Sequence, residues 1–246
     1  MQLMKLTMRK INKNIKDIPI SLNSKNTEKK RNELIKSKKL LSGNFNANYK
    51  AEDVKNKLNE IYHQKCAYCE QKVEQIEIEH YRPKSIYYWL IYSWDNLFFV
   101  CPKCNKFKNN YFENENERVN FEDKDLTNIH QLRDKYDKIE KPKVFNPEKE
   151  NPQKLLKFDK KGKIFSKHEN LQFTINLCQL NREYLTDKRK KFFDETIRII
   201  KISISGIGSQ IAQKEKLNEI LKKDDTLEFT AYRNFCKEIL KKMLKF

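Results

Sequence analysis

Two pairs of cysteines carry the most specific chemical signal in this 246-residue sequence. Cys66 and Cys69 form one CxxC pair, and Cys101 and Cys104 form the other. Each pair presents two thiolates from one tight turn, and two such turns can complete the tetrahedral ligand set of a zinc ion. Because four thiolates leave no open coordination position, we expect a structural Zn²⁺ with any catalysis beside it.

A second group of polar residues lies between these cysteine pairs and just after the second pair. Glu79 directly precedes His80, and two asparagines, Asn96 and Asn105, follow. Hydrolysis of a phosphodiester needs a base for the attacking water and a cation that offsets the charge of the phosphate oxygens. A histidine with a pKa of ~6.5 can be that base, and one carboxylate with one amide oxygen suits Mg²⁺ or Mn²⁺. Taken alone, His80 would instead be interpreted as a surface or hydrogen-bonded structural residue.

The order of these residues within the frame of CxxC pairs resembles the HNH endonucleases. Their fold, the ββα-metal motif, places a divalent ion between a hairpin and a helix. The resemblance implies that His80 is the general base and that Asn96 braces the loop that holds it. It also implies that Asn105 and Glu79, which stands where Asp is usual, hold the ion. We expect a main-chain carbonyl of the loop before Asn96 to orient the His80 ring.

Further segments are similar to the PtuB family, including EHYRPKS, WDNLFFVCPKCNKFKNN, VFNPEKENPQ and TINLCQLNREYLTDKR. The similarity covers about residues 60–190. Members of this family are HNH nuclease subunits of Septu and of certain retron-associated anti-phage systems, and they work with an ABC/SMC-type ATPase, PtuA. The resemblance therefore implies a metal-dependent endonuclease acting with a PtuA-like ATPase, with DNA favoured as substrate and RNA or tRNA as the alternative. A non-catalytic zinc module that binds nucleic acid is the rival from a different class.

The balance of charge is strongly basic, with a formal net charge of +18. Half of this excess falls in residues 1–48, where twelve basic residues face three acidic ones. Such clustering favours a nucleic acid as partner, although an AT-rich gene would also add lysine throughout the chain. Near the site, four basic residues are candidate phosphate contacts, with a solvated loop as the alternative: Arg82, Lys84, Lys106 and Lys108.

The compartment is predicted from the N-terminus and from hydropathy. The first residues contain no continuous apolar stretch of the kind found in secretory signals, and no window approaches the ~20 apolar residues of a membrane span. We therefore expect a cytoplasmic protein without a membrane partner. Thiols stay reduced there, which favours metal binding over disulfides.

The predicted fold is α+β and predominantly helical, with a zinc-stapled HNH ββα-metal core surrounded by helices. Hydrophobic spacing predicts helices over residues 26–42, 50–64 and 105–111, strands over residues 71–79 and 97–100, and a small hairpin over residues 155–165. From residue 169 onward the pattern is helical. We expect three regions: a basic N-terminal arm and helix (1–48), the nuclease core (49–125) and a mostly helical C-terminal region (126–246). The candidate partner-binding surface is the C-terminal region or, as the alternative, the basic N-terminal arm.

Overall fold

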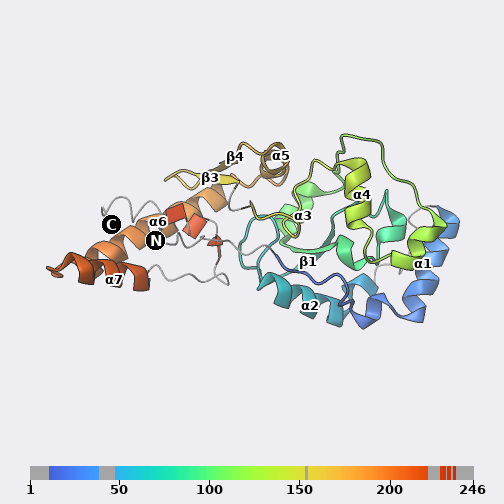
Figure 1. The fold of residues 1–246 in the computed structure, drawn as a ribbon, viewed down its shortest axis with the longest axis horizontal. Helices are drawn as coiled ribbons and strands as arrows, with labels where there is room; N and C mark the ends of the chain where they lie inside the picture. The colour runs from blue at the N-terminus through green and yellow to red at the C-terminus, as the bar shows by residue number, and fades with distance from the viewer. Residues whose placement is uncertain are drawn as a thin grey trace.

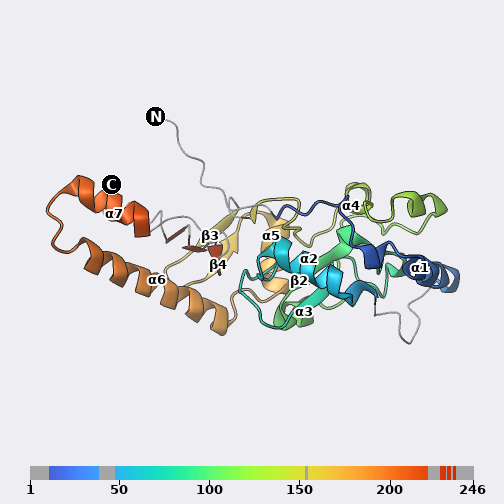
Figure 2. The ribbon, with the colours of Figure 1, turned by 90° about the horizontal axis from the view of Figure 1, so that it is seen from below.

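The computed structural model describes residues 11–38, 48–152, 155–220, 228–230, 232–233 and 235–236. Its helices and two small hairpins form an elongated molecule, with α1 at one end and the pair α6 and α7 at the other (Figures 1 and 2). The predicted α+β, mainly helical class is confirmed. None of the described helices has both the length and the apolar character that crossing a bilayer requires.

The centre of the fold is a two-stranded hairpin followed by a short helix. Strand β1 (Glu77–His80) pairs antiparallel with β2 (Leu97–Val100), whose four residues are all buried, and the register places His80 opposite Leu97. Helix α3 (Pro102–Lys108) follows β2 directly. The hairpin and helix therefore have the order of a ββα motif.

Two elements of this motif have bounds that differ from those predicted. Strand β1 is shorter than residues 71–79, because the chain from the first cysteine pair turns back on itself through a bridge between Lys65 and Lys72. Helix α3 begins three residues before the predicted start at Asn105 and ends at Lys108, three residues before the predicted end at residue 111. Cys101 caps its N-terminus, and Pro102, whose missing N–H costs nothing at this position, occupies its first turn.

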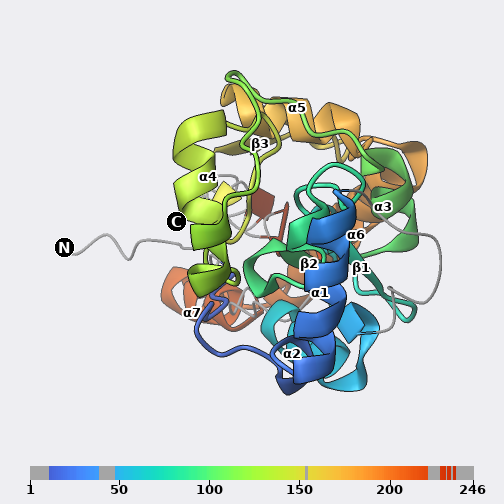
Figure 3. The ribbon, with the colours of Figure 1, turned by 90° about the vertical axis from the view of Figure 1, so that its right-hand side faces the viewer.

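Helices from both sides of the sequence surround this centre (Figure 3). Helix α1 (Lys25–Ser37) begins at the side-chain cap of Ser24 and ends where Lys38 adopts the left-handed conformation, so it stops before the predicted end at residue 42. The glycine predicted to end it, Gly43, lies outside the described residues. Helix α2 (Glu52–Tyr62) confirms the second predicted helix and contacts β2. Helix α4 (Arg133–Glu140) was not predicted.

The C-terminal half begins with the predicted second hairpin, β3 (Leu156–Phe158) paired with β4 (Ile164–Ser166). Gly162 in its turn has φ +81°, and a Cβ there would lie 2.3 Å from the carbonyl oxygen of Thr186, so only glycine fits. Three helices follow: α5 (Glu169–Leu177), α6 (Glu183–Ile204) and α7 (Gln210–Ile220). Most of the last predicted helix, residues 237–246, lies outside the described residues.

Residues 11–38 of the predicted basic arm pack onto the core. Lys13 is buried, and its ammonium donates to the carbonyl of Leu97 at 2.6 Å and pairs with Glu148 at 3.2 Å. Leu22 and Leu34 join the hydrophobic core. We propose that these residues belong to the same folded unit as the hairpin, and Lys13 itself is not placed to contact an external phosphate.

Candidate active site and metal centre

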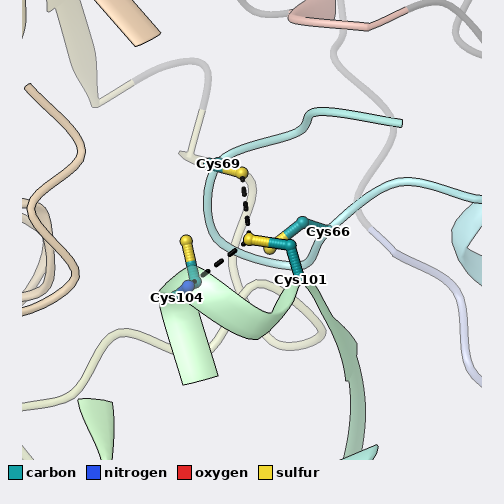
Figure 4. A group of neighbouring side chains, drawn as sticks. All are labelled: Cys66, Cys69, Cys101 and Cys104. Carbon is teal, nitrogen blue, oxygen red and sulfur yellow. Dashed lines mark hydrogen bonds between the residues drawn. The ribbon is translucent and has the colours of Figure 1, made fainter. Parts of the chain in front are cut away.

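The two cysteine pairs meet at the start of α3. All four cysteines are buried, and their sulfur atoms lie within 4.8 Å of one another, gathered around one point (Figure 4). Cys69 Sγ and Cys101 Sγ are 3.9 Å apart. Zinc–sulfur bonds of ~2.3 Å in a tetrahedron would place sulfurs about 3.8 Å apart, so the cluster fits a zinc ion. The predicted grouping of Cys66, Cys69, Cys101 and Cys104 is confirmed.

An arginine from the C-terminal region contacts this cluster. Arg182, at the start of α6, places Nη1 3.7 Å from Cys104 Sγ and also donates to the carbonyls of Cys178 and Gln179. A guanidinium in this position partly balances the negative charge that a four-thiolate zinc centre carries. Sequence analysis did not select Arg182, because 78 residues separate it from Cys104.

His80 lies at the end of β1 with its ring held on two sides. Its Nε2 is 2.9 Å from the carbonyl oxygen of Ile91. Because a carbonyl only accepts, Nε2 carries the hydrogen and Nδ1 is left as the basic nitrogen. The ring of Tyr49 stands edge-on at 4.6 Å between centroids. Ile91 belongs to the loop before Asn96, so the expected orienting hydrogen bond is confirmed.

The environment of His80 keeps the imidazole neutral. Burial, together with nearby lysines, lowers the pKa of His80 to about 3, although the hydrogen bond to Ile91 acts in the opposite direction. The lysines concerned are Lys84, Lys108 and Lys50. A neutral ring is the form that can accept a proton from water.

Asn96 joins the two ends of the loop between β1 and β2. Its Oδ1 accepts the backbone N–H of Arg82 at 2.8 Å, and its Nδ2 donates to the carbonyls of Arg82 and Leu90. Leu90 directly precedes Ile91, the acceptor for the His80 ring. These contacts agree with a bracing role for Asn96.

Helix α3 faces β1 with the remaining predicted site residues. Lys108 Nζ lies 2.5 Å from Glu79 Oε1 and donates to the carbonyl of His80 at 3.1 Å. The Asn105 amide nitrogen donates to the carboxylate of Glu77. Burial raises the pKa of Glu79, and the Lys108 ammonium opposes this shift.

The donor set at this interface suits a hard divalent cation. Glu79 supplies a buried carboxylate whose Oε1 is paired with the Lys108 ammonium, and Asn105 supplies an amide oxygen from α3. The structure places Glu79 on β1 and Asn105 on α3. Glu79 is paired with Lys108, and Asn105 donates to Glu77. Glu77 was not among the predicted site residues. Side chains alternate along β1, so Glu77 points to the same face as Glu79, and this explains its contact with Asn105.

The predicted phosphate contacts divide into two kinds. Arg82 is buried and forms ion pairs with Asp137 at 2.7 Å and with Glu140, so its predicted contact with nucleic acid is wrong. Lys108 is also buried and points into the site. Lys84 is half-buried and donates to the Tyr49 hydroxyl at 3.0 Å, and Lys106 is exposed. For these last two, a phosphate contact stays a prediction.

The hairpin, helix and cysteine cluster define a ββα site of the HNH class, and comparison with known proteins agrees. Residues 66–111 match the family model described as HNH endonuclease, so the chain carries an HNH endonuclease domain. The chain is homologous to Septu protein PtuB of Bacillus mycoides (strain KBAB4), with 33% identity over 164 residues that cover 58% of this chain and 52% of PtuB. The predicted resemblance is thereby confirmed.

A second curated protein of the same strain is also similar. Septu protein PtuA is 24% identical over 153 residues, which cover 56% of this chain and 20% of PtuA. The chain thus spans about half the length of PtuB and a fifth of the length of PtuA.

Proposed function

We propose that this protein is a metal-dependent HNH endonuclease that hydrolyses phosphodiester bonds of nucleic acid, with DNA as the favoured substrate. The observation that carries this proposal is the buried His80 imidazole, whose Nε2–H is donated to the Ile91 carbonyl and which directly follows the buried carboxylate of Glu79 on β1. The match of residues 66–111 to the HNH model supports it.

The chemistry follows from the proton positions at His80. With Nε2–H donated to the Ile91 carbonyl, Nδ1 takes the proton of the attacking water. Glu79 and Asn105 would hold Mg²⁺ or Mn²⁺, which offsets negative charge on the phosphate oxygens and the leaving oxygen. Asn96 keeps the loop that carries Ile91 in place. As for other HNH enzymes, we expect a 5′-phosphate and a 3′-hydroxyl as products.

The cysteine cluster has a structural role in this proposal. A Zn²⁺ ion held by four thiolates has no position left for water or substrate, so it would fix the start of α3 relative to the chain before β1. Asn105 and Lys108 lie on that helix. Zinc therefore would position the catalytic side chains without taking part in the reaction.

We further propose that the protein acts in anti-phage defence with a PtuA-like ATPase in the cytoplasm. The similarity to Septu protein PtuB supports this assignment. The C-terminal helical region (126–246) is our candidate for the docking surface, because α6 and α7 extend away from the nuclease centre (Figure 1).

The decisive experiment compares wild-type protein with His80→Ala. Each is purified with its ATPase and incubated with plasmid DNA, linear DNA, RNA and tRNA in the presence of Mg²⁺ or Mn²⁺. We expect wild type to cleave and the variant to lose at least about a hundredfold in rate, since general-base catalysis contributes roughly that much. EDTA should abolish cleavage.

A matched control separates lost chemistry from lost folding. His168→Ala removes a histidine that lies outside the proposed site and should leave cleavage intact. The proposal is wrong if wild type cleaves none of these nucleic acids, or if His80→Ala cleaves at the wild-type rate. Binding without cleavage would support the non-catalytic zinc module instead.

A further inference from the structure

A short turn outside the segment matched by the HNH model lies against the proposed general base. The 3-10 turn Asn48–Lys50 precedes α2, and its central residue, Tyr49, is buried with its ring edge-on to His80 at 4.6 Å. The matched segment begins only at residue 66. The N-terminal region thus contributes directly to the surroundings of His80.

Helix α1 fixes the position of this turn. Asn48 Nδ2 donates to the Thr27 hydroxyl, and Lys30 Nζ donates to Asn48 Oδ1 at 2.9 Å. Both partners lie on α1, so the turn is held from its outer side while Tyr49 packs inward. The orientation of the turn is therefore set by its hydrogen bonds with α1.

Two lysines flank the Tyr49 ring. Lys84 Nζ lies 5.2 Å from the ring centroid and donates to the Tyr49 hydroxyl at 3.0 Å. Lys50 Nζ lies 5.9 Å from the same centroid, and its side chain is exposed. Within the part of the chain that the structure describes, Lys50 forms no salt bridge, so its charge is available to a ligand. One aromatic ring thus brings two ammonium groups close to His80.

We propose that Lys50 and Lys84, both close to the Tyr49 ring, form a phosphate-binding cradle that positions the phosphodiester backbone of the nucleic acid beside His80. This inference rests on the proposed nuclease function and deepens it. An ammonium group is a compact donor that binds phosphate as a point charge. The cradle recognises the backbone, which DNA and RNA share, and it carries no sequence preference.

The cradle differs from the general basic surface in its geometry. Lys106 on α3 is exposed as well, but no contact with His80 or its neighbours is found for it among the described residues. Arg82 is buried with carboxylates. Lys50 and Lys84 instead share an anchor, Tyr49, that touches the His80 ring itself.

Binding measured without cleavage tests the cradle. The full-length protein with His80→Ala, without added Mg²⁺ or Mn²⁺, is titrated into a fluorescein-labelled 20-base-pair DNA duplex, and into a labelled RNA of one strand's sequence, while anisotropy is recorded at several salt concentrations. Adding Lys50→Ala and Lys84→Ala should weaken binding at least about tenfold. For the duplex, the slope of log affinity against log salt should fall by about 1.8, because each lost phosphate contact removes about 0.9.

The matched control removes the same charge elsewhere. Lys191 and Lys201 are exposed on α6. Lys191→Ala with Lys201→Ala, in the same His80→Ala background, should change affinity less than about twofold, since these lysines lie outside the cradle. Thermal unfolding of all three proteins confirms that each is folded.

The outcomes separate this inference from the proposed function. Equal weakening by the cradle pair and the control pair would overturn the cradle, even if wild type cleaves nucleic acid. Selective weakening by the cradle pair would support it, even if wild type cleaves nothing and the nuclease proposal fails. A selective effect with only one of the two nucleic acids would contradict recognition of the shared backbone and would overturn the cradle as proposed.

Discussion

Asn96 makes several backbone contacts from one buried side chain. It accepts from the N–H of Arg82 and donates to two carbonyls, one of Arg82 and one of Leu90. Both carbonyls and the N–H are backbone groups that need a partner when buried. The residue therefore stabilises the protein and orients the proposed base at the same time.

Asn96→Ala should lower the free energy of unfolding by about 3 kcal/mol, because it leaves buried backbone groups without partners. Urea unfolding followed by circular dichroism measures this change. Asn110→Ala, at an exposed position after α3, is the control and should change stability by less than about 0.5 kcal/mol. An Asn96→Ala protein as stable as wild type would show that the brace is dispensable.

The hydrogen bonds of Asn96 agree with its predicted bracing role, whereas the buried ion pairs of Arg82 do not agree with a phosphate contact, and the difference lies in how far away in sequence the partners are. The role of Asn96 followed from a local motif, and its partners lie within 14 positions in sequence. Arg82 is neutralised by Asp137 and Glu140, which are 55 and 58 positions away. A single sequence shows a charge but does not show which distant carboxylate will cover it.

Among the elements, α3 connects the zinc cluster to the proposed active site. Its first turn carries Cys104, and its later turns carry Asn105 and Lys108. The spacing of the cysteines predicted this cluster because each pair is a local turn. Helix α4 and the Arg182 contact were not predictable in this way, since both depend on packing between distant segments.

Arg182→Met should weaken zinc binding roughly tenfold, because groups that contact metal ligands typically contribute that much. Zinc transfer to a chromogenic chelator, measured in wild type and variant, tests this without any assay of cleavage. Arg182→Lys keeps the charge but loses the fork of donors and should fall between the two. Tyr184→Phe, an exposed change two residues further on, is the control. If Arg182→Met releases zinc as slowly as wild type, the contact with Cys104 has no influence on the metal.

Across the whole molecule, a buried charged network joins distant parts of the chain. Glu148 accepts from Lys13, from Arg133 and from the Tyr62 hydroxyl, and its side chain is almost fully buried. These partners come from the N-terminal segment, α2 and α4. Lys13 also lies over the Trp94 ring at 4.3 Å.

Glu148→Ala should destabilise the protein by about 3–5 kcal/mol, since it leaves the buried charges of Lys13 and Arg133 without their common carboxylate. Glu150→Ala, at an exposed position two residues later, should have little effect. Thermal and urea unfolding compare the two. A small and equal effect of both substitutions would mean that the network adds no stability.

The contacts that distant segments make with the hairpin and the cysteine cluster have a practical consequence for protein engineers. A graft of residues 66–111 alone onto another scaffold would leave behind the tyrosine beside the imidazole, the lysine on the Leu97 carbonyl and the arginine on the Cys104 sulfur. A transplant that preserves these neighbours has to run from residue 13 at least to residue 182, so the portable unit is several times larger than the recognisable motif.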